Sequence, residues 1–520
     1  MGLIADTKRA LKESPREIFN LNVLLYTWIF SFPGISKGFD EGNIGSIVTQ
    51  TRFKVKFEVA DQSDSQYADT KGWIVSIATA GAVLGCLGCL PLNDRIGRRW
   101  TLRLATLFYI AGILGQGLCN GNLSGLYASR VIAGMGIGAT TIVPPVYIAE
   151  HASCQMLGVV LGFFINYGVT KSYAGTDKQW MLPTLLQLVP AVVWGVGTFI
   201  CPESPRWLFA TGRRERAIAT LCKIRKLPAD HPLIVSEINA IEIQILHEVE
   251  AVSNSSLWDQ LKETLIPVEN RRRFCLTFMA TLFSQWSGAN AITQYSPTIF
   301  GYLGINGIES TFLATGIYAI VKFVSTMLFG IFVVDFIGRR RSLMTGICLQ
   351  ITTLAFVGAY LGVTKDMTAN NINNTPSASR ASTAAIVAIY LHAVAWSIGW
   401  FSIPYILGPE IFPIRIRSLN VSISMAFHWL FYFASSRAMP SLLAATDKWG
   451  AFVFFGSICT VSLVYVFFAM PDTTGRSIEA LDSLFQRPWY TVWRVAYPTA
   501  KERQETIDDP KSTAEHVEKV

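Results

Sequence analysis

The feature that most constrains the fold is a short basic loop that occurs twice. The sequence Asp-Arg-Ile-Gly-Arg-Arg at 94–99 returns about 240 residues later as Asp-Phe-Ile-Gly-Arg-Arg at 335–340, and each copy directly follows a long apolar run. Short, strongly basic loops between apolar segments remain on the cytoplasmic side of a membrane. Two equivalent loops on one side predict a membrane protein built from two parallel repeats, related by an axis along the membrane normal.

The composition agrees with a polytopic membrane protein and argues against other classes. Hydrophobic residues make up 51% of the chain and charged residues 15%, as in chains with many membrane spans. The net charge of +8 comes from loops and tails, where Lys and Arg orient a membrane protein, so it does not indicate nucleic-acid binding. The sequence contains no phosphate-binding Gly-Lys-Ser loop, no Gly-x-Ser-x-Gly elbow and no paired metal ligands. We therefore expect no enzymatic activity, no cofactor and no metal.

The chain contains twelve apolar runs of the length that a membrane span needs, about 20 residues. We predict spans at 22–48, 73–92, 101–119, 125–148, 154–172, 182–201, 274–300, 311–335, 342–363, 383–411, 417–440 and 450–470. The predicted units are a cytoplasmic N-terminal tail (1–21), an N-terminal six-helix half (22–201), a cytoplasmic linker (202–272), a C-terminal six-helix half (273–471) and a cytoplasmic C-terminal tail (472–520). The expected fold class is an all-α membrane protein.

The two segments outside the spans have different expected structures. Alternating charges at a spacing compatible with helices predict short amphipathic helices in the linker. The tail from about residue 486 is charged and short of apolar residues, and we expect it to be largely disordered.

Five further motifs stand at the predicted ends of the spans. They are PESPRW (202–207), GPEIFP (408–413), PDTTGR (471–476), PVYIAE (145–150) and QWSGAN (285–290). Together with the two basic loops, this ordered set resembles the sugar porter family of the major facilitator superfamily, especially its fungal sugar, quinate and galacturonate permeases. The resemblance covers nearly the whole chain outside the tails. It implies a twelve-helix fold whose halves rock around a midplane site by alternating access, driven by protons.

Charges at the expected cytoplasmic ends of the helices form the first group of candidate functional residues. Acids and arginines on neighbouring helix ends can form strong charged hydrogen bonds, and in the family such networks hold the outward-facing state. The candidates for this cytoplasmic gate are Asp94, Arg98, Arg99, Glu150, Asp335, Arg339, Arg340, Glu410, Arg415 and Arg417. The alternative is that these charges only orient the chain in the membrane.

Two charges inside predicted spans form the second group. Asp40 lies in the first span and Arg130 opens the fourth, and charges within spans are costly and usually functional. The resemblance matches them to the Asp and Arg that couple proton entry in the family's symporters. Because a carboxylate gains or loses its proton as an arginine moves away from it or toward it, this pair is the candidate proton-coupling site. The alternative is a static ion pair that only packs two helices.

The third group consists of candidate substrate-binding residues. They are Ser284, Gln285, Asn290, Lys322, Tyr405 and His428. By the resemblance, Gln285 and Asn290 match residues that hydrogen-bond sugar hydroxyls. Ser284 stands where the family usually has a second glutamine, and Tyr405 where many members have a sugar-stacking tryptophan.

The nature of the substrate depends on the cations among these residues. Lys322 lies in the middle of the eighth span, and an intramembrane cation needs an anionic partner. His428, if protonated, would add a second positive charge. We therefore predict a polyhydroxylated acid such as a uronic acid or quinate. The alternative is a neutral monosaccharide, with Lys322 paired to an internal acid or a carbonyl group.

One departure from the family lies between Glu150 and Gly158, where family members carry a longer turn. Either the fifth helix is shifted in register, or the chain is a defective carrier. The function hypotheses are therefore a proton-coupled carrier, a neutral hexose or pentose carrier, a nutrient sensor that does not transport, and a non-functional carrier. The resemblance further implies a small-molecule substrate with protons as partners and a plasma-membrane location, with a vacuolar membrane as the alternative. Because one chain already holds both halves, we expect a functional unit of one chain.

Overall fold

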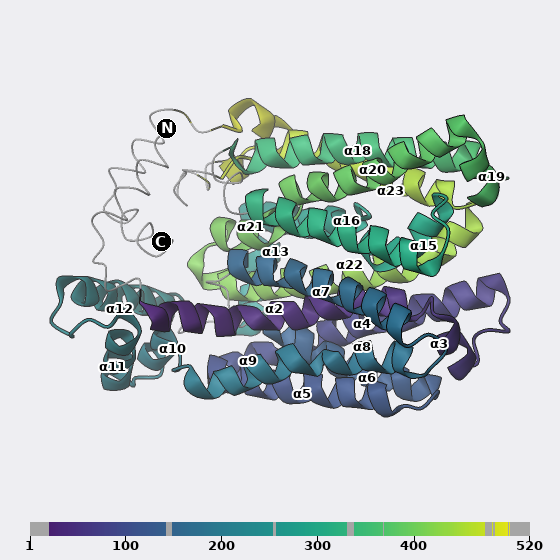
Figure 1. The fold of residues 1–520 in the computed structure, drawn as a ribbon. Helices are drawn as coiled ribbons and strands as arrows, with labels where there is room; N and C mark the ends of the chain where they lie inside the picture. Colours follow the sequence, from purple (N-terminus) through teal and green to yellow (C-terminus); the bar gives the residue numbers. More distant parts are fainter. Residues whose placement is uncertain are drawn as a thin grey trace.

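The computed structural model describes residues 20–141, 148–252, 256–329, 337–367 and 369–473, and then 481, 484–497 and 499. Every regular element within these residues is a helix. The long helices run alongside one another, while three linker helices gather at one end of the bundle, on the left of Figure 1. These are α10 (Pro205–Ala210), α11 (Arg214–Arg225) and α12 (Pro232–Val252).

The first half of the bundle precedes the linker. Its helices are α2 (Leu21–Ile47), α3 (Thr51–Lys56), α4 (Asp64–Ile96), α5 (Arg98–Leu118), α6 (Leu123–Thr140), α7 (Ile148–Ser172), α8 (Lys178–Leu186) and α9 (Leu188–Ile200). Only Gln187 separates α8 from α9, so these two form one broken helix. The half therefore consists of six long units and the short α3.

The second half follows α13 (Leu257–Leu265), the last helix of the linker. Its helices are α14 (Val268–Trp286), α15 (Ala289–Tyr302), α16 (Ile308–Leu328), α18 (Arg339–Val363), α19 (Ala369–Asn374), α20 (Pro376–Ile398), α21 (Ile403–Ile411), α22 (Ile414–Ala445) and α23 (Trp449–Ala469). The pairs α14/α15 and α20/α21 are broken helices, and the first break contains Gly288 with φ of +86°. The predicted fold of twelve helices in two six-helix halves is confirmed.

Seven stretches of the described helices are long and apolar enough to cross a membrane by length and composition alone. They are Asp64–Cys89, Arg98–Leu118, Lys178–Ile200, Ile308–Leu328, Arg339–Val363, Pro376–Ile411 and Trp449–Ala469. Helix α2 is not among them because its interior carries Lys37, Asp40 and Glu41, all buried. Charged residues inside a span usually face the interior of the bundle and not the lipid, and they are usually functional.

Helices α2 and α7 approach each other closely because both have glycine at the contact. A methyl group added at Gly38 would lie 1.8 Å from the carbonyl oxygen of Gln155, and one added at Gly158 would lie 2.2 Å from the carbonyl oxygen of Ile35. Small residues at such positions allow the backbones of membrane helices to pack directly against each other. The polar side chains of α2 are thereby fixed in depth and direction.

The predicted boundaries of the fourth and fifth spans, at 125–148 and 154–172, are wrong. Helix α6 ends at Thr140, and α7 begins at Ile148, so Glu150 lies in the first turn of α7 and not at the end of the fourth span. Residues 142–147, between these two helices, lie outside the described part of the chain. Helix α7 has 25 residues, and at about 1.5 Å per residue it is longer than the hydrocarbon core of about 30 Å.

The two halves contact each other along α4 and α22, which run antiparallel. Near one end Arg437 pairs with Asp69. Toward the other end the Sγ atom of Cys86 lies 4.0 Å from the carbonyl oxygen of Ser422. Positions 69 and 86 of α4 are separated by about 25 Å at the usual helical rise. The contact therefore closes the bundle on this side through most of its depth.

The predicted disorder of the C-terminal tail is wrong for one segment. Residues Trp489–Val495 form a 3-10 helix, η4, and Trp493 stacks on Phe467 of α23 with 5.9 Å between ring centroids. The tail is charged overall, but its aromatic residues are concentrated in this segment, where they cover the end of α23. Residues 501–520 lie outside the described part of the chain.

Replacing Gly38 by alanine should lower the thermal stability of the purified protein. The new methyl group meets backbone atoms of α7, which cannot rotate away, and overpacking of this kind costs about 1–3 kcal/mol. Gly88→Ala in α4 is the matched control, because a methyl group there has no atom within 4 Å. Equal melting temperatures of the two variants in detergent would contradict the proposed tight α2/α7 contact.

Candidate functional site

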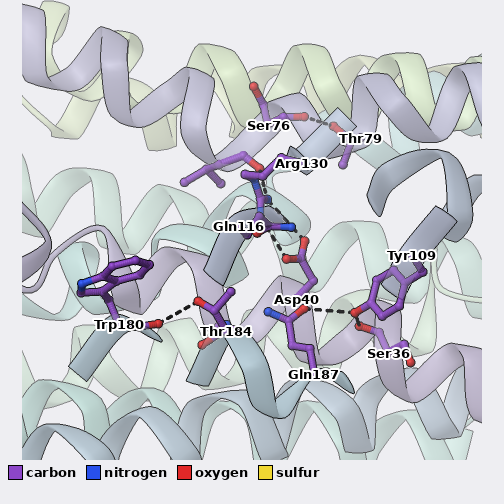
Figure 2. A network of polar contacts seen from close by, with 12 residues as sticks. Ser36, Asp40, Ser76, Thr79, Tyr109, Gln116, Arg130, Trp180, Thr184 and Gln187 are labelled. Atoms are coloured by element: carbon purple, nitrogen blue, oxygen red, sulfur yellow. Dashed lines mark hydrogen bonds and ion pairs between the residues drawn. The ribbon is translucent and has the colours of Figure 1, made fainter. Parts of the chain in front are cut away.

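Asp40 of α2 and Arg130 of α6 form a buried ion pair. Arg130 Nη1 donates to Asp40 Oδ1 at 3.0 Å, and Nη2 donates to Oδ2 at 3.3 Å. The Arg130 side chain is 1% exposed, and it also donates to Gln116 Oε1 at 3.4 Å and to the carbonyl oxygen of Val75 at 3.1 Å. Figure 2 shows the guanidinium group pointing at the carboxylate with Gln116 beside it. The pair thus joins four helices of the first half.

A second set of hydrogen bonds positions α2 from its other side. The Tyr109 hydroxyl of α5 lies 3.1 Å from the carbonyl oxygen of Ser36 and 3.0 Å from Gln187 Oε1, as Figure 2 shows. Trp194 Nε1 donates to Ser36 Oγ at 3.2 Å. These contacts hold the helix turn that precedes Asp40.

A small cavity of about 20 Å³, roughly the space of one water molecule, lies beside the ion pair and is lined by residues of both halves. Its wall combines charged groups of α2 with residues of both halves: Lys37, Asp40, Glu41, Ala78, Thr79, Ala82, Ile137, Gln294, Trp429 and Tyr432. Helix α15 supplies Gln294 and α22 supplies Trp429 and Tyr432. Residues from both halves therefore meet around one polar space.

Lys322 of α16 is fully buried and has an internal acidic partner. Its Nζ atom donates to Thr293 Oγ1 at 2.8 Å and lies 3.9 Å from Glu41 Oε1. It also lies 4.5 Å from the centroid of the Trp396 ring. Glu41 in turn accepts from Gln155 Nε2 at 3.1 Å. The internal acid that the sequence left open as a partner of Lys322 is Glu41.

Four of the predicted substrate-binding residues form one buried chain of hydrogen bonds. Asn290 Nδ2 donates to Gln285 Oε1 at 2.8 Å, Gln285 Nε2 lies 3.1 Å from His428 Nδ1, and His428 Nε2 lies 3.0 Å from the Tyr405 hydroxyl. Because an amide nitrogen only donates, Nδ1 of His428 accepts and carries no proton. His428 is therefore neutral in this arrangement and supplies no positive charge.

The remaining predicted substrate-binding residue, Ser284, lies near the start of this chain of hydrogen bonds. It is 2% exposed, and its carbonyl oxygen accepts from Ser287 Oγ at 2.8 Å in the break between α14 and α15. The cavity wall, as far as the chain is described, includes none of the six predicted substrate-binding residues. Lys322 reaches this wall through its contact with Glu41.

The basic loop of the first half binds an acid that the sequence analysis did not single out. Glu203 Oε1 accepts from the backbone N–H of Arg99 at 3.2 Å, and Arg98 Nη1 donates to Ser204 Oγ at 3.0 Å. Both partners belong to the 202–207 motif. The position of this motif directly after an apolar span could have indicated that its acid is a partner of the basic loop.

The basic loop of the second half pairs with Glu410, another of the gate candidates. Arg339 Nη2 donates to Glu410 Oε1 at 3.0 Å, and Thr473 Oγ1 donates to Oε2 at 2.6 Å. Arg340 Nη2 donates to the carbonyl oxygen of Phe467 at 2.5 Å. Charged hydrogen bonds therefore connect α18, α21 and the segment after α23.

The other gate candidates either have partners outside the two basic loops or have side chains that lie outside the described part of the structure. Arg415 pairs with Glu263 of the linker helix α13 at 3.0 Å, and Arg417 donates to the carbonyl oxygen of Phe412 at 3.0 Å. The linker is thus attached to the second half. The described atoms do not include the side chains of Asp94 and Glu150, or any part of Asp335.

A model of the family described as Sugar (and other) transporter matches residues 26–485. The chain belongs to this family, the sugar porters of the major facilitator superfamily. A probable quinate permease of Aspergillus niger is 35% identical over 504 residues, which cover 93% of this chain and 91% of the relative. The quinate permease of Emericella nidulans is 33% identical over 515 residues, covering 95% of this chain and 94% of the relative.

Solved structures with the same arrangement of helices are also transporters. The proton:xylose symporter XylE superposes on this sugar porter with a TM-score of 0.71 at 21% identity, covering 89% of this chain and 99% of that one. A partially occluded inward open form of XylE from E. coli gives 0.70 at 20% identity, covering 88% and 100%. This likeness shows the fold, and with the named permeases it makes this sugar porter a membrane transporter and not an enzyme.

Two charged residues of this sugar porter line the cavity but were not among the predicted site residues. Lys37 and Glu41 flank Asp40 in α2 and are 6% and 4% exposed. Both are charges within a span, as Asp40 is, and therefore carry the same sequence signal. Gln294 and Trp429 were also missed, and neither residue type carries such a signal in an apolar helix.

Replacing Glu410 by alanine should lower the melting temperature of the purified sugar porter by several degrees. The change removes the acceptor of Arg339 and Thr473, and charged hydrogen bonds contribute about 1.5–3 kcal/mol each. Glu309→Ala is the control, because that exposed acid lies in the first turn of α16 at the opposite end. An unchanged melting temperature for the Glu410 variant would indicate that the basic loop only orients the chain in the membrane and does not stabilise the fold.

Proposed function

We propose that this chain is a proton-coupled carrier that takes up a polyhydroxylated monocarboxylic acid, such as quinate or a sugar acid, by alternating access. The observation that carries the proposal is the buried Asp40–Arg130 pair, whose carboxylate also lines the cavity between the halves. A titratable group in contact with the transport path can exchange a proton with each side in turn as the halves rock.

The geometry of the pair supports proton coupling. While both nitrogens of Arg130 hold both oxygens of Asp40, the negative charge of the carboxylate has a cationic partner. Separation of α2 from α6 would leave that charge buried without a partner, and proton uptake would then neutralise it. The position of Arg130 relative to Asp40 thereby links the conformational change to the proton.

An acidic substrate is supported by the names of the relatives and by the content of the cavity wall. The relatives that are 33–35% identical are named quinate permeases. The wall combines an ammonium group, that of Lys37, with the amide of Gln294 and the aromatic ring of Trp429. A carboxylate, hydroxyl groups and a ring face would each find a chemically matching surface there.

A neutral monosaccharide is the second candidate. The pairing of Lys322 with Glu41 favours it, because a lysine with an internal acid does not require an anionic substrate. The neutral form of His428 removes a second argument for an acid. A non-functional carrier is disfavoured by the 25-residue α7, which is long enough to cross. A non-transporting sensor is the remaining alternative.

We place the basic loops, the linker helices and both chain ends on the cytoplasmic side of the plasma membrane, with one chain as the functional unit. The Arg339–Glu410 pair and the contacts of Glu203 with the first loop would then act as the cytoplasmic gate. Breaking them would favour conformations that are open to the cytoplasm.

The uptake of labelled substrates by a transporter-deficient cell that expresses the chain tests the proposed function. Quinate, galacturonate, glucose and xylose are compared at acidic and neutral pH, with and without a protonophore. We expect faster uptake of an acid at low pH, inhibited by the protonophore. Glucose outcompeting both acids would support the neutral carrier, and surface-expressed protein without uptake of any of the four would favour the sensor.

Asp40→Asn should abolish acid-stimulated, concentrative uptake but leave exchange of labelled for unlabelled substrate intact. An amide occupies the place of the carboxylate but cannot accept the proton. Because a broken buried pair costs about 3–5 kcal/mol, the amount of protein at the surface is measured in the same cells. Asp177→Asn, which alters a partly exposed pair with Arg52, is the control. Retained protonophore-sensitive accumulation in the Asp40 variant would make the pair purely structural.

A further inference from the structure

Lys37 is a buried cation that, among the described residues, makes no hydrogen bond and no ion pair within 4.0 Å, although the charge of Glu41 lies one helical turn away. It lies in α2, is 6% exposed and lines the cavity. The Nζ atom of Lys37 lies over the ring of Trp429, 4.6 Å from the ring centroid. A contact with a ring face offsets only part of the cost of desolvating an ammonium group, about 2 kcal/mol when buried, whereas that cost amounts to several kcal/mol.

Among the described residues, the charged groups at and beside the cavity include three cations and two acids. Asp40 is held by two nitrogens of Arg130. Glu41 is shared between Lys322 and Gln155. Each acid therefore already has a cationic partner, and Lys37 is the third cation. His428 does not alter the balance because its Nδ1 accepts a hydrogen bond.

A second polar group of the wall also lacks a partner. Gln294 is 3% exposed, lines the same cavity, and its Oε1 atom has no hydrogen-bond partner in the described structure. An unpaired buried acceptor costs about 1–3 kcal/mol. The cavity thus presents an ammonium donor, an amide acceptor and the indole ring of Trp429.

We propose that Lys37 binds the carboxylate of the substrate, while Gln294 accepts a hydrogen bond from one of its hydroxyl groups and Lys322 serves as the internal partner of Glu41. This inference rests on the proposed function and assigns the selection of acids over neutral ligands to a residue in the first helix. A monocarboxylate supplies the single negative charge that the cluster lacks. A neutral sugar would leave Lys37 buried without an anion.

The test compares an acid with its neutral ester on the purified full-length chain. Quinate and methyl quinate differ in charge but share the ring and hydroxyl groups. Titration calorimetry measures the dissociation constants of both for the unchanged protein, Lys37→Gln and Lys71→Gln. Lys71 is the matched control, because it is also 6% exposed, does not line the cavity and donates to Thr298 at 2.6 Å.

We expect Lys37→Gln to weaken quinate binding by about 10–100-fold, the range of a hydrogen bond to a charged group, and to leave methyl quinate nearly unaffected. The Lys71 variant should retain the preference for the acid. A preference that survives in Lys37→Gln overturns the assignment of Lys37 while leaving the proposed function in place. An unchanged protein that binds the ester as tightly as the acid overturns the proposed acidic substrate itself.

A second variant tests the same charge balance by making the net charge around the cavity more positive. Glu41→Gln removes a negative charge one helical turn from Lys37, so quinate should bind several-fold more tightly and methyl quinate should not. This result does not depend on the folding of the Lys37 variant. Equal changes for the acid and the ester would contradict the proposal, because they would show that charge at this site does not act on the carboxylate.

Discussion

The burial of charge in the centre of the bundle is the constraint on which the rest of the structure depends. Arg130 is 1% exposed, and such a group is tolerated within a membrane protein only when it is paired. Its four hydrogen bonds go to Asp40, Gln116 and Val75 on three different helices. The helices of the first half must therefore keep a common register, and any rearrangement has to supply these groups with new partners.

Close helix packing makes this register possible. At the α2/α7 contact, glycines bring the two backbones together, so that Gln155 of α7 reaches the carboxylate of Glu41 at 3.1 Å. Larger residues at this contact would push the two helices apart and break the hydrogen bond between Gln155 and Glu41. The hydrophobic driving force is weak between helices in lipid, and packing of small residues takes its place.

The sequence predicted features that depend on local composition and missed those that depend on three-dimensional placement. The duplicated basic loop and the apolar runs were enough for twelve helices in two halves. The end of α6 at Thr140 was missed because an apolar run does not reveal where a helix ends. Asp40 and Arg130 were found from the cost of intramembrane charge. The partners of Lys322 could not be read from the sequence, because Glu41 and Thr293 belong to different halves.

The placement of Lys37, Asp40 and Glu41 within two turns of one helix has a mechanistic consequence. Positions three and four apart lie on neighbouring parts of the same helix face, so the group proposed for the proton and the group proposed for the substrate cannot move independently. Helix α2 also contacts the second half, since Gly45 packs against the backbone of Gln294. A tilt of α2 would therefore alter the Asp40–Arg130 pair, the environment of Lys37 and the contact between the halves together. Coupling between proton and substrate then requires no relay of side chains across the protein, because one rigid helix carries both sites.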